Sequence, residues 1–186
     1  KLINEFIEVL EKSFNLNYEK RRIVMVVPLL RMHGGPTTML SIANELSNHG
    51  HDVSITTLYS DINHEVTRTT DLPIDVNSQN IPKCDVAIIN SDNPLCPAVA
   101  KSSQIKKKVL LKLSQNARFK QLEEQGLQQD WDAIITSSQW LKDICEVVPN
   151  GWNYFPKKAH RVGWWHYGHD HFAKDPNDRK YNDGID

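Results

Sequence analysis

Short apolar runs alternate with helix-like patterns along most of the chain. The strand-like runs lie at 23–30, 53–58, 86–90, 109–113, 133–136 and 161–164. Between them, apolar residues recur every three to four positions, as in helices, at 36–49, 95–103, 117–128 and 138–147. Several runs are continuously apolar, which is typical of strands buried on both faces. The alternation predicts an α/β fold with a doubly wound, mostly parallel sheet that is covered by helices.

Three stretches depart from this alternation. Residues 2–14 place apolar side chains at helical spacing and predict an amphipathic helix, which either packs on the domain or contacts a membrane surface or a partner. Residues 61–80 are polar and predict a surface segment with a short helix and an edge strand at 74–76. We therefore expect a helical extension at 1–20, an α/β domain at 21–172 and a polar linker at 173–186.

Composition narrows the class of partner. The 186 residues include 22 basic and 23 acidic ones, which gives a net charge of -1 and no basic stripe for nucleic acid. The basic run at 106–108 precedes an apolar run and is interpreted as a solvated strand entrance. Three cysteines without a CxxC pair predict a reduced, cytoplasmic setting. No apolar run approaches the length of a membrane span.

Polar residues gather where the predicted strands end. Ligands bind parallel sheets outside the carboxyl ends of the strands, so these residues are candidates for a polar ligand cleft. They are His33, Asn90, Asp92, Gln115, Asn116 and His166. Two have a simpler alternative: Asp92 as a helix cap or Asx turn before Pro94, and His33 as a surface loop residue.

Paired glycines separate the first predicted strand from the helix that closes at Gly50. A turn at Gly34 and Gly35, with Pro36 at the first helical position, would aim the N–H groups of Thr37 and Thr38 at a phosphate. The alternative is an ordinary connection between a strand and a helix. The spacing matches neither a dinucleotide fingerprint nor a P-loop.

Four consecutive motifs together resemble the beginning of glycosyltransferases of the GT-B fold, family 4 in particular. They are Val26-Val27-Pro28, Gly34-Gly35-Pro36-Thr37-Thr38, Leu40-Ser41-Ile42-Ala43-Asn44-Glu45-Leu46 and Gly50-His51-Asp52-Val53. Later stretches that resemble the same family lie at 83–89, 132–142, 161–162 and 168–172. The resemblance thus extends over about residues 22–172.

This resemblance implies the Rossmann-like, N-terminal and acceptor-side half of a transferase. Such an enzyme moves a sugar from a nucleotide-sugar donor to a glycan or lipid-linked acceptor, generally with retention, and we expect no cofactor. Gly34 and Gly35, with Thr37 as a weaker neighbour, would contact the donor diphosphate. The nucleotide itself would be held mainly by a C-terminal domain, so we expect these residues alone to be inactive and to bind donor weakly or not at all. Polysaccharide biosynthesis in the cytoplasm, or peripherally at the inner face of the cell membrane, is the implied setting.

The catalytic base stays unknown. Many family members have a histidine where this chain has Ser114-Gln115-Asn116, none of which titrates near neutral pH. Either the leaving phosphate acts as base, with Asp92 orienting the acceptor, or the chain is a non-catalytic half-domain that binds a glycan or a partner. A sugar-nucleotide epimerase of the same architecture is a third alternative.

Aromatic residues and histidines cluster at 164–171, where either sugar stacking or packing is expected. Their spacing matches no zinc signature, so we expect no metal.

Overall fold

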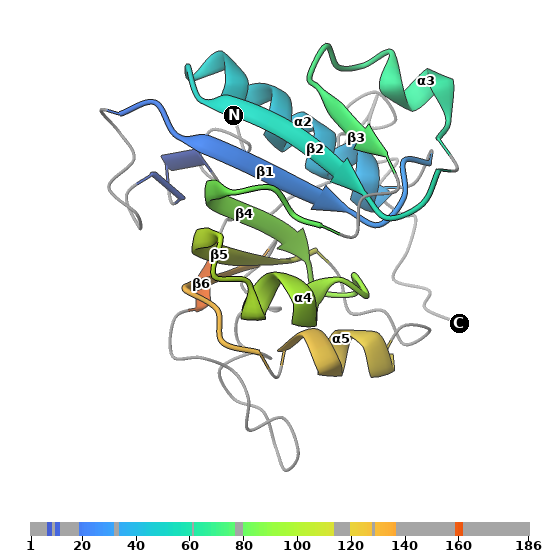
Figure 1. Cartoon of the computed structure of the whole chain (residues 1–186). Helices are drawn as coiled ribbons and strands as arrows, with labels where there is room; N and C mark the ends of the chain where they lie inside the picture. The colour runs from blue at the N-terminus through green and yellow to red at the C-terminus, as the bar shows by residue number, and fades with distance from the viewer. Residues whose placement is uncertain are drawn as a thin grey trace, which may run out of the picture.

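Seven parallel strands form one sheet in the computed structural model of the chain (Figure 1). The structure describes residues 7–8, 10–11, 19–31, 34–60, 62–76, 80–113, 120–127, 129–136 and 159–161. Across the sheet the strands follow the order β3-β2-β1-β4-β5-β6-β7. Their bounds are Arg22–Val27 for β1, Asp52–Thr57 for β2, Ile74–Val76 for β3, Cys84–Asn90 for β4, Ile105–Lys112 for β5, Ala133–Thr136 for β6 and Ala159–Arg161 for β7. The predicted doubly wound parallel sheet is therefore confirmed.

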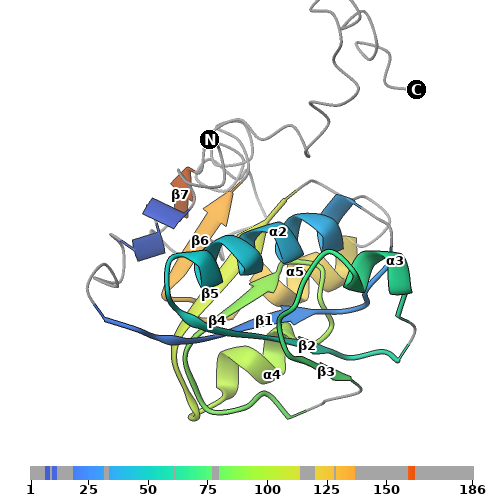
Figure 2. The ribbon, with the colours of Figure 1, turned by 90° about the horizontal axis from the view of Figure 1, so that it is seen from above.

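Helices cover both faces of this sheet (Figures 1 and 2). Their bounds are Gly34–Asn48 for α2, His64–Thr67 for α3, Cys96–Lys101 for α4 and Lys120–Leu127 for α5. Helix α2 packs on one face, whereas α4 and α5 pack on the other. This three-layer arrangement explains the continuously apolar strands, because side chains on both faces of the sheet are buried.

Strand alternation divides the core into two clusters. In β4, Val86 and Ile88 pack with α2, while Ala87 and Ile89 pack with α4 and α5. All four are fully buried. Burying a large aliphatic side chain contributes about 1.5–3 kcal/mol, so the central strands are the main source of stability.

The described part of the N-terminal segment packs on the domain. Residues 7–8 and 10–11 are helical, and Ile7 and Leu10 are fully buried against the α2 face. Glu11 adds polar contacts, because its Oε1 lies 3.3 Å from His49 Nδ1 and 3.4 Å from His51 Nε2. Packing, one of the two alternatives predicted for this segment, therefore holds for these residues.

The structure confirms most predicted elements but moves two strand starts. The strand expected at 161–164 begins at Ala159 in β7, and residues 162–164 lie outside the described part of the chain. The short helix α3 and the edge strand β3 are present as expected. Strand β5 begins at Ile105, so the basic run lies inside the strand rather than ahead of it. Lys106 and Lys107 are held there by Asp85 and Asp132, at 2.7 and 3.2 Å. The helix expected at 138–147 and the linker at 173–186 lie outside the described residues.

Candidate functional site

The strand order reverses between β1 and β4. Strand β1 pairs with β2 on one side and with β4 on the other. The segments that follow β1 and β4 therefore run to opposite faces of the sheet. In α/β sheets, ligands bind between two such segments, at the carboxyl ends of the strands. In this protein, the start of α2 and the end of β4 lie at this point (Figure 1).

Gly35 and Asn90 meet at this point. A Cβ atom on Gly35 would lie 3.8 Å from Asn90 Nδ2, and outside its own helix no other described atom would lie within 4 Å. Asn90 Oδ1 accepts a hydrogen bond from the N–H of Ser91 at 2.9 Å, which fixes the amide orientation. The half-buried amide therefore presents its NH₂ group beside the first turn of α2. Two sequence-predicted residues are thus brought together at the reversal of the strand order.

The glycine pair does not form the predicted turn. Helix α2 begins at Gly34, so Pro36 is its third residue rather than its first. Of the described glycines, only Gly50 has a positive φ, at 91°. Pro36 is tolerated because N–H groups in the first helical turn have no acceptor within the helix.

This helix start changes which N–H groups are available to a ligand. Those of Gly34 and Gly35 lie in the first turn of α2, whereas the N–H of Thr38 lies one turn later, within reach of the Gly34 carbonyl. The side chain of Thr38 is buried and that of Thr37 is exposed. The expectation that Thr38 faces a phosphate is therefore wrong, and the two glycines are the better candidates.

Asn93, rather than Asp92, forms the Asx turn around Pro94, and α4 begins without a side-chain cap. Its Oδ1 accepts a hydrogen bond from the N–H of Leu95 at 2.9 Å, and its Nδ2 donates to the Val26 carbonyl at 3.2 Å. The Asn93 side chain is buried and ties the loop after β4 to β1. Asp92 lies half-buried on the same loop, and its role in orienting an acceptor stays a prediction.

Lys112 is a polar residue that the sequence analysis overlooked. It ends β5 with a fully buried side chain and lies in register with Thr136 of β6, which is also fully buried. Strand alternation places both side chains on the same face as Leu110 and Ile134, beneath α4 and α5. Fully buried lysines are rare. The sequence feature that could have indicated this one is the position of Lys112 inside the apolar run at 109–113.

The two described cysteines are buried thiols with little nucleophilic character. Burial raises the pKa of Cys84 to about 11 and also raises that of Cys96. Cys96 Sγ lies 3.3 Å from the Asn90 carbonyl, so it supports the end of β4. Because thiolates are the reactive form, we assign both residues to packing rather than catalysis.

Four candidate residues lie outside the described part of the chain. They are His33, Gln115, Asn116 and His166. Among the residues that are described, no group of three or more metal-binding side chains is found. None of the described helices is long and apolar enough to cross a membrane.

Comparisons of the chain with protein-family models, curated proteins and solved structures find no match. A functional assignment therefore depends on the ordered sequence motifs and on the geometry at the strand reversal.

Proposed function

We propose that this chain is the acceptor-side domain of a glycosyltransferase that uses a nucleotide-sugar donor. The observation that carries the proposal is the position of Gly35 beside Asn90, where the strand order reverses. The ordered motifs that resemble GT-B enzymes of family 4 support the same assignment.

In this proposal, the start of α2 stabilises the donor diphosphate. The first-turn N–H groups of Gly34 and Gly35 carry the positive end of the helix dipole, and the absence of side chains lets a phosphate approach them closely. The Asn90 NH₂ group adds a neutral donor from the end of β4. Negative charge builds up on the diphosphate as the sugar leaves, so donors fixed in place before the reaction favour the transition state.

The acceptor would lie at the same strand ends. Asp92 lies two residues after the end of β4 and is proposed to orient an acceptor hydroxyl group by accepting its hydrogen bond. Most of the rate enhancement would then come from positioning donor and acceptor together, with the leaving phosphate taking the proton.

The proposal is tested with the natural, full-length protein that contains this sequence. A panel of uridine, guanosine and adenosine diphosphate sugars is offered with glycan and lipid-linked acceptors, and release of the nucleoside diphosphate is measured. We expect the protein to release the nucleoside diphosphate from at least one donor, and an acceptor to stimulate this release. Absence of both release and sugar transfer across the panel would argue against the proposal.

A non-catalytic, glycan-binding half-domain is the second candidate. It is favoured by Ser114-Gln115-Asn116, where a titrating histidine is missing. The same panel separates the two functions, because a binding domain retains glycan affinity without consuming any donor.

A further inference from the structure

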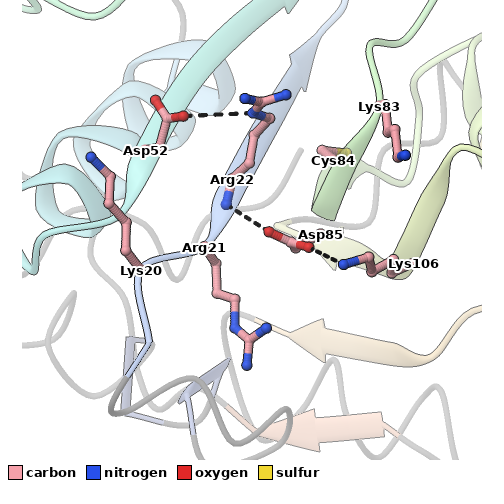
Figure 3. A pocket seen from close by; sticks show the side chains of 8 residues that line it. All are labelled: Lys20, Arg21, Arg22, Asp52, Lys83, Cys84, Asp85 and Lys106. Carbon is pink, nitrogen blue, oxygen red and sulfur yellow. Dashed lines mark hydrogen bonds and ion pairs between the residues drawn. The ribbon is translucent and has the colours of Figure 1, made fainter.

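A basic hollow lies at the opposite, amino-terminal edge of the sheet (Figure 3). Its volume is about 440 Å³, within the range of small-molecule sites. Residues at the starts of β1, β2, β4 and β5, or directly before them, line it. They are Lys20, Arg21, Arg22, Asp52, Lys83, Cys84, Asp85 and Lys106.

The hollow concentrates positive charge in a chain that is close to neutral. Five basic side chains and two carboxylates line it, whereas the whole sequence has a net charge of -1. These basic groups surround the hollow from several sides (Figure 3), and an excess of positive charge raises the local concentration of anions. The hollow is therefore suited electrostatically to an anionic ligand.

Asp85 is already engaged by the protein. Its Oδ1 accepts a hydrogen bond from Lys106 Nζ at 2.7 Å, and its Oδ2 accepts one from the N–H of Arg22 at 2.9 Å (Figure 3). These contacts, the one from Lys106 first, hold the pKa of Asp85 below its ordinary value. The carboxylate thus fixes the hollow's shape, and its charge is largely compensated.

Two lysines have no such partner. Within the described part of the chain, Lys20 and Lys83 make no side-chain hydrogen bond or ion pair. They come from different segments, one before β1 and the other before β4. Both ammonium groups therefore remain available to a ligand.

The two arginines add positive charge to the same hollow. Arg22 Nε lies 3.6 Å from Asp52 Oδ2, and both side chains are more than half exposed, so this pair is weak. Arg21 Nη2 pairs with Glu19 at 2.5 Å, but its buried Nε has no hydrogen-bond partner among the described residues. The Arg21 guanidinium points away from the other lining side chains (Figure 3), so Arg21 contributes positive charge beside the hollow rather than a donor inside it.

We propose that this hollow binds a phosphate group of a small phosphorylated molecule. Guanidinium and ammonium groups together are the usual protein ligands of phosphate, and arginine offers it two parallel hydrogen bonds. The site does not depend on the proposed transferase activity, because it lies at the other edge of the sheet from Gly35 and Asn90. Phosphate on a lipid headgroup has the same chemistry, so the experiment distinguishes the two sources.

The test uses the ¹⁵N-labelled chain and two probes. Inorganic pyrophosphate is titrated while the amide resonances of residues 20–22 and 83–85 are followed, and vesicles of phosphatidylcholine with phosphatidic acid are tested by cosedimentation. The double variant Lys20→Gln, Lys83→Gln removes the two unpaired lysines. The matched control, Arg68→Gln with Lys101→Gln, removes two exposed charges that do not line the hollow.

We expect pyrophosphate to shift these resonances and the double variant to raise its Kd about tenfold, because positive charge is removed from both sides of the hollow. The control variant should keep the wild-type Kd. Vesicle binding that is lost in the double variant would assign the same site to a lipid phosphate. The proposal is overturned if the wild-type chain binds neither probe, or if the double variant binds as tightly as the control.

Discussion

Gly35 and Gly50 lie at the two ends of α2 and have different backbone requirements. Gly50 follows the helix with a φ of 91°, a conformation that favours glycine. Its N–H donates to the Ser47 carbonyl, and that of His51 donates to the Leu46 carbonyl, which together form a Schellman cap. Gly35 has ordinary helical geometry and open space around its missing side chain. Of these two glycines, only Gly50 is therefore required by the fold.

These two glycines should respond in opposite ways to alanine. We expect Gly50→Ala to lower the free energy of unfolding by about 1 kcal/mol, because alanine is strained at positive φ. Gly35→Ala should raise it by a few tenths of a kcal/mol, because alanine has the higher helix propensity. Urea denaturation of both variants measures the difference. A loss of stability in Gly35→Ala would mean that the glycine is needed structurally.

Burial and chemistry at single residues were only partly predictable from the sequence. Asn90 was identified because it comes at the end of a clear apolar strand. In parallel sheets, ligands bind at the carboxyl ends of the strands, which is where Asn90 lies. The Asx turn of Asn93 was missed, because Asp92 and Asn93 have equivalent acceptor atoms and only the loop geometry selects between them. The burial of Lys112 depends on α4 and α5, which lie on the face it shares with Leu110.

At the scale of elements, α5 is fitted closely against the loop after β4. A Cβ atom on Gly126 would lie 2.6 Å from the Ser91 carbonyl oxygen and 3.1 Å from Cys96 Sγ. The Gly126 carbonyl accepts a hydrogen bond from Trp131 Nε1 at 2.8 Å, which fixes the end of the helix. The helix therefore has no room for a side chain at this position.

Alanine at Gly126 should separate α5 from this loop. We expect Gly126→Ala to lower the free energy of unfolding by about 1–3 kcal/mol, the usual cost of overpacking. Gln125→Ala, on the exposed side of the same helix, should change it by less than about 0.5 kcal/mol. Thermal or urea unfolding compares the two variants, and equal effects would contradict the close contact.

Asp85 joins the starts of three strands. It lies in β4 and accepts hydrogen bonds from the first residue of β1 and from Lys106 of β5. Its lowered pKa means that the folded state favours the charged carboxylate. This stabilisation is present above the ordinary pKa of 3.8 and is lost as the pH falls through the lower folded value.

Replacing Asp85 should remove this pH dependence. We expect Asp85→Asn to cost about 1 kcal/mol near pH 7, a modest value because the group is partly exposed. Between pH 5 and pH 2, stability should fall less steeply in the variant than in the wild type. Urea denaturation across this range provides the measurement. Parallel pH profiles would show that Asp85 does not contribute in this way.

The starts of two elements, α2 and β5, were not predicted correctly from the local sequence pattern. Because proline is most frequent at the first helical position, the helix was predicted to begin at Pro36. It begins two residues earlier, at Gly34. Three lysines in a row were interpreted as a solvated strand entrance, but Lys106 and Lys107 lie inside β5, where carboxylates distant in sequence stabilise them. Local patterns do not contain such long-range pairings.

For the molecule as a whole, the parallel sheet was predictable and the second site was not. Apolar runs separated by helical segments leave few alternatives to a doubly wound sheet, so the architecture follows from the pattern. The reversal of strand order then places Gly35 and Asn90 together. The basic hollow at the opposite edge is assembled from residues scattered between 20 and 106, and each of them alone resembles an ordinary surface charge.

The two edges of the sheet are therefore proposed to have separate roles. The carboxyl edge would serve the sugar donor and acceptor, and the amino edge would bind a phosphorylated small molecule. Because the two sites share no described residue, a change at one should leave ligand binding at the other unaffected.

The most direct measurement is nucleotide-sugar turnover by the natural, full-length protein carrying Gly35→Val. The branched side chain would occupy the space beside Asn90 and block approach to the first-turn N–H groups of α2. We predict that kcat/KM for the donor falls about tenfold or more, while urea unfolding shows a folded protein. Ser47→Val, near the other end of α2, should keep wild-type turnover. Unchanged turnover in a folded Gly35→Val protein would contradict the central claim that this helix start contacts the donor diphosphate.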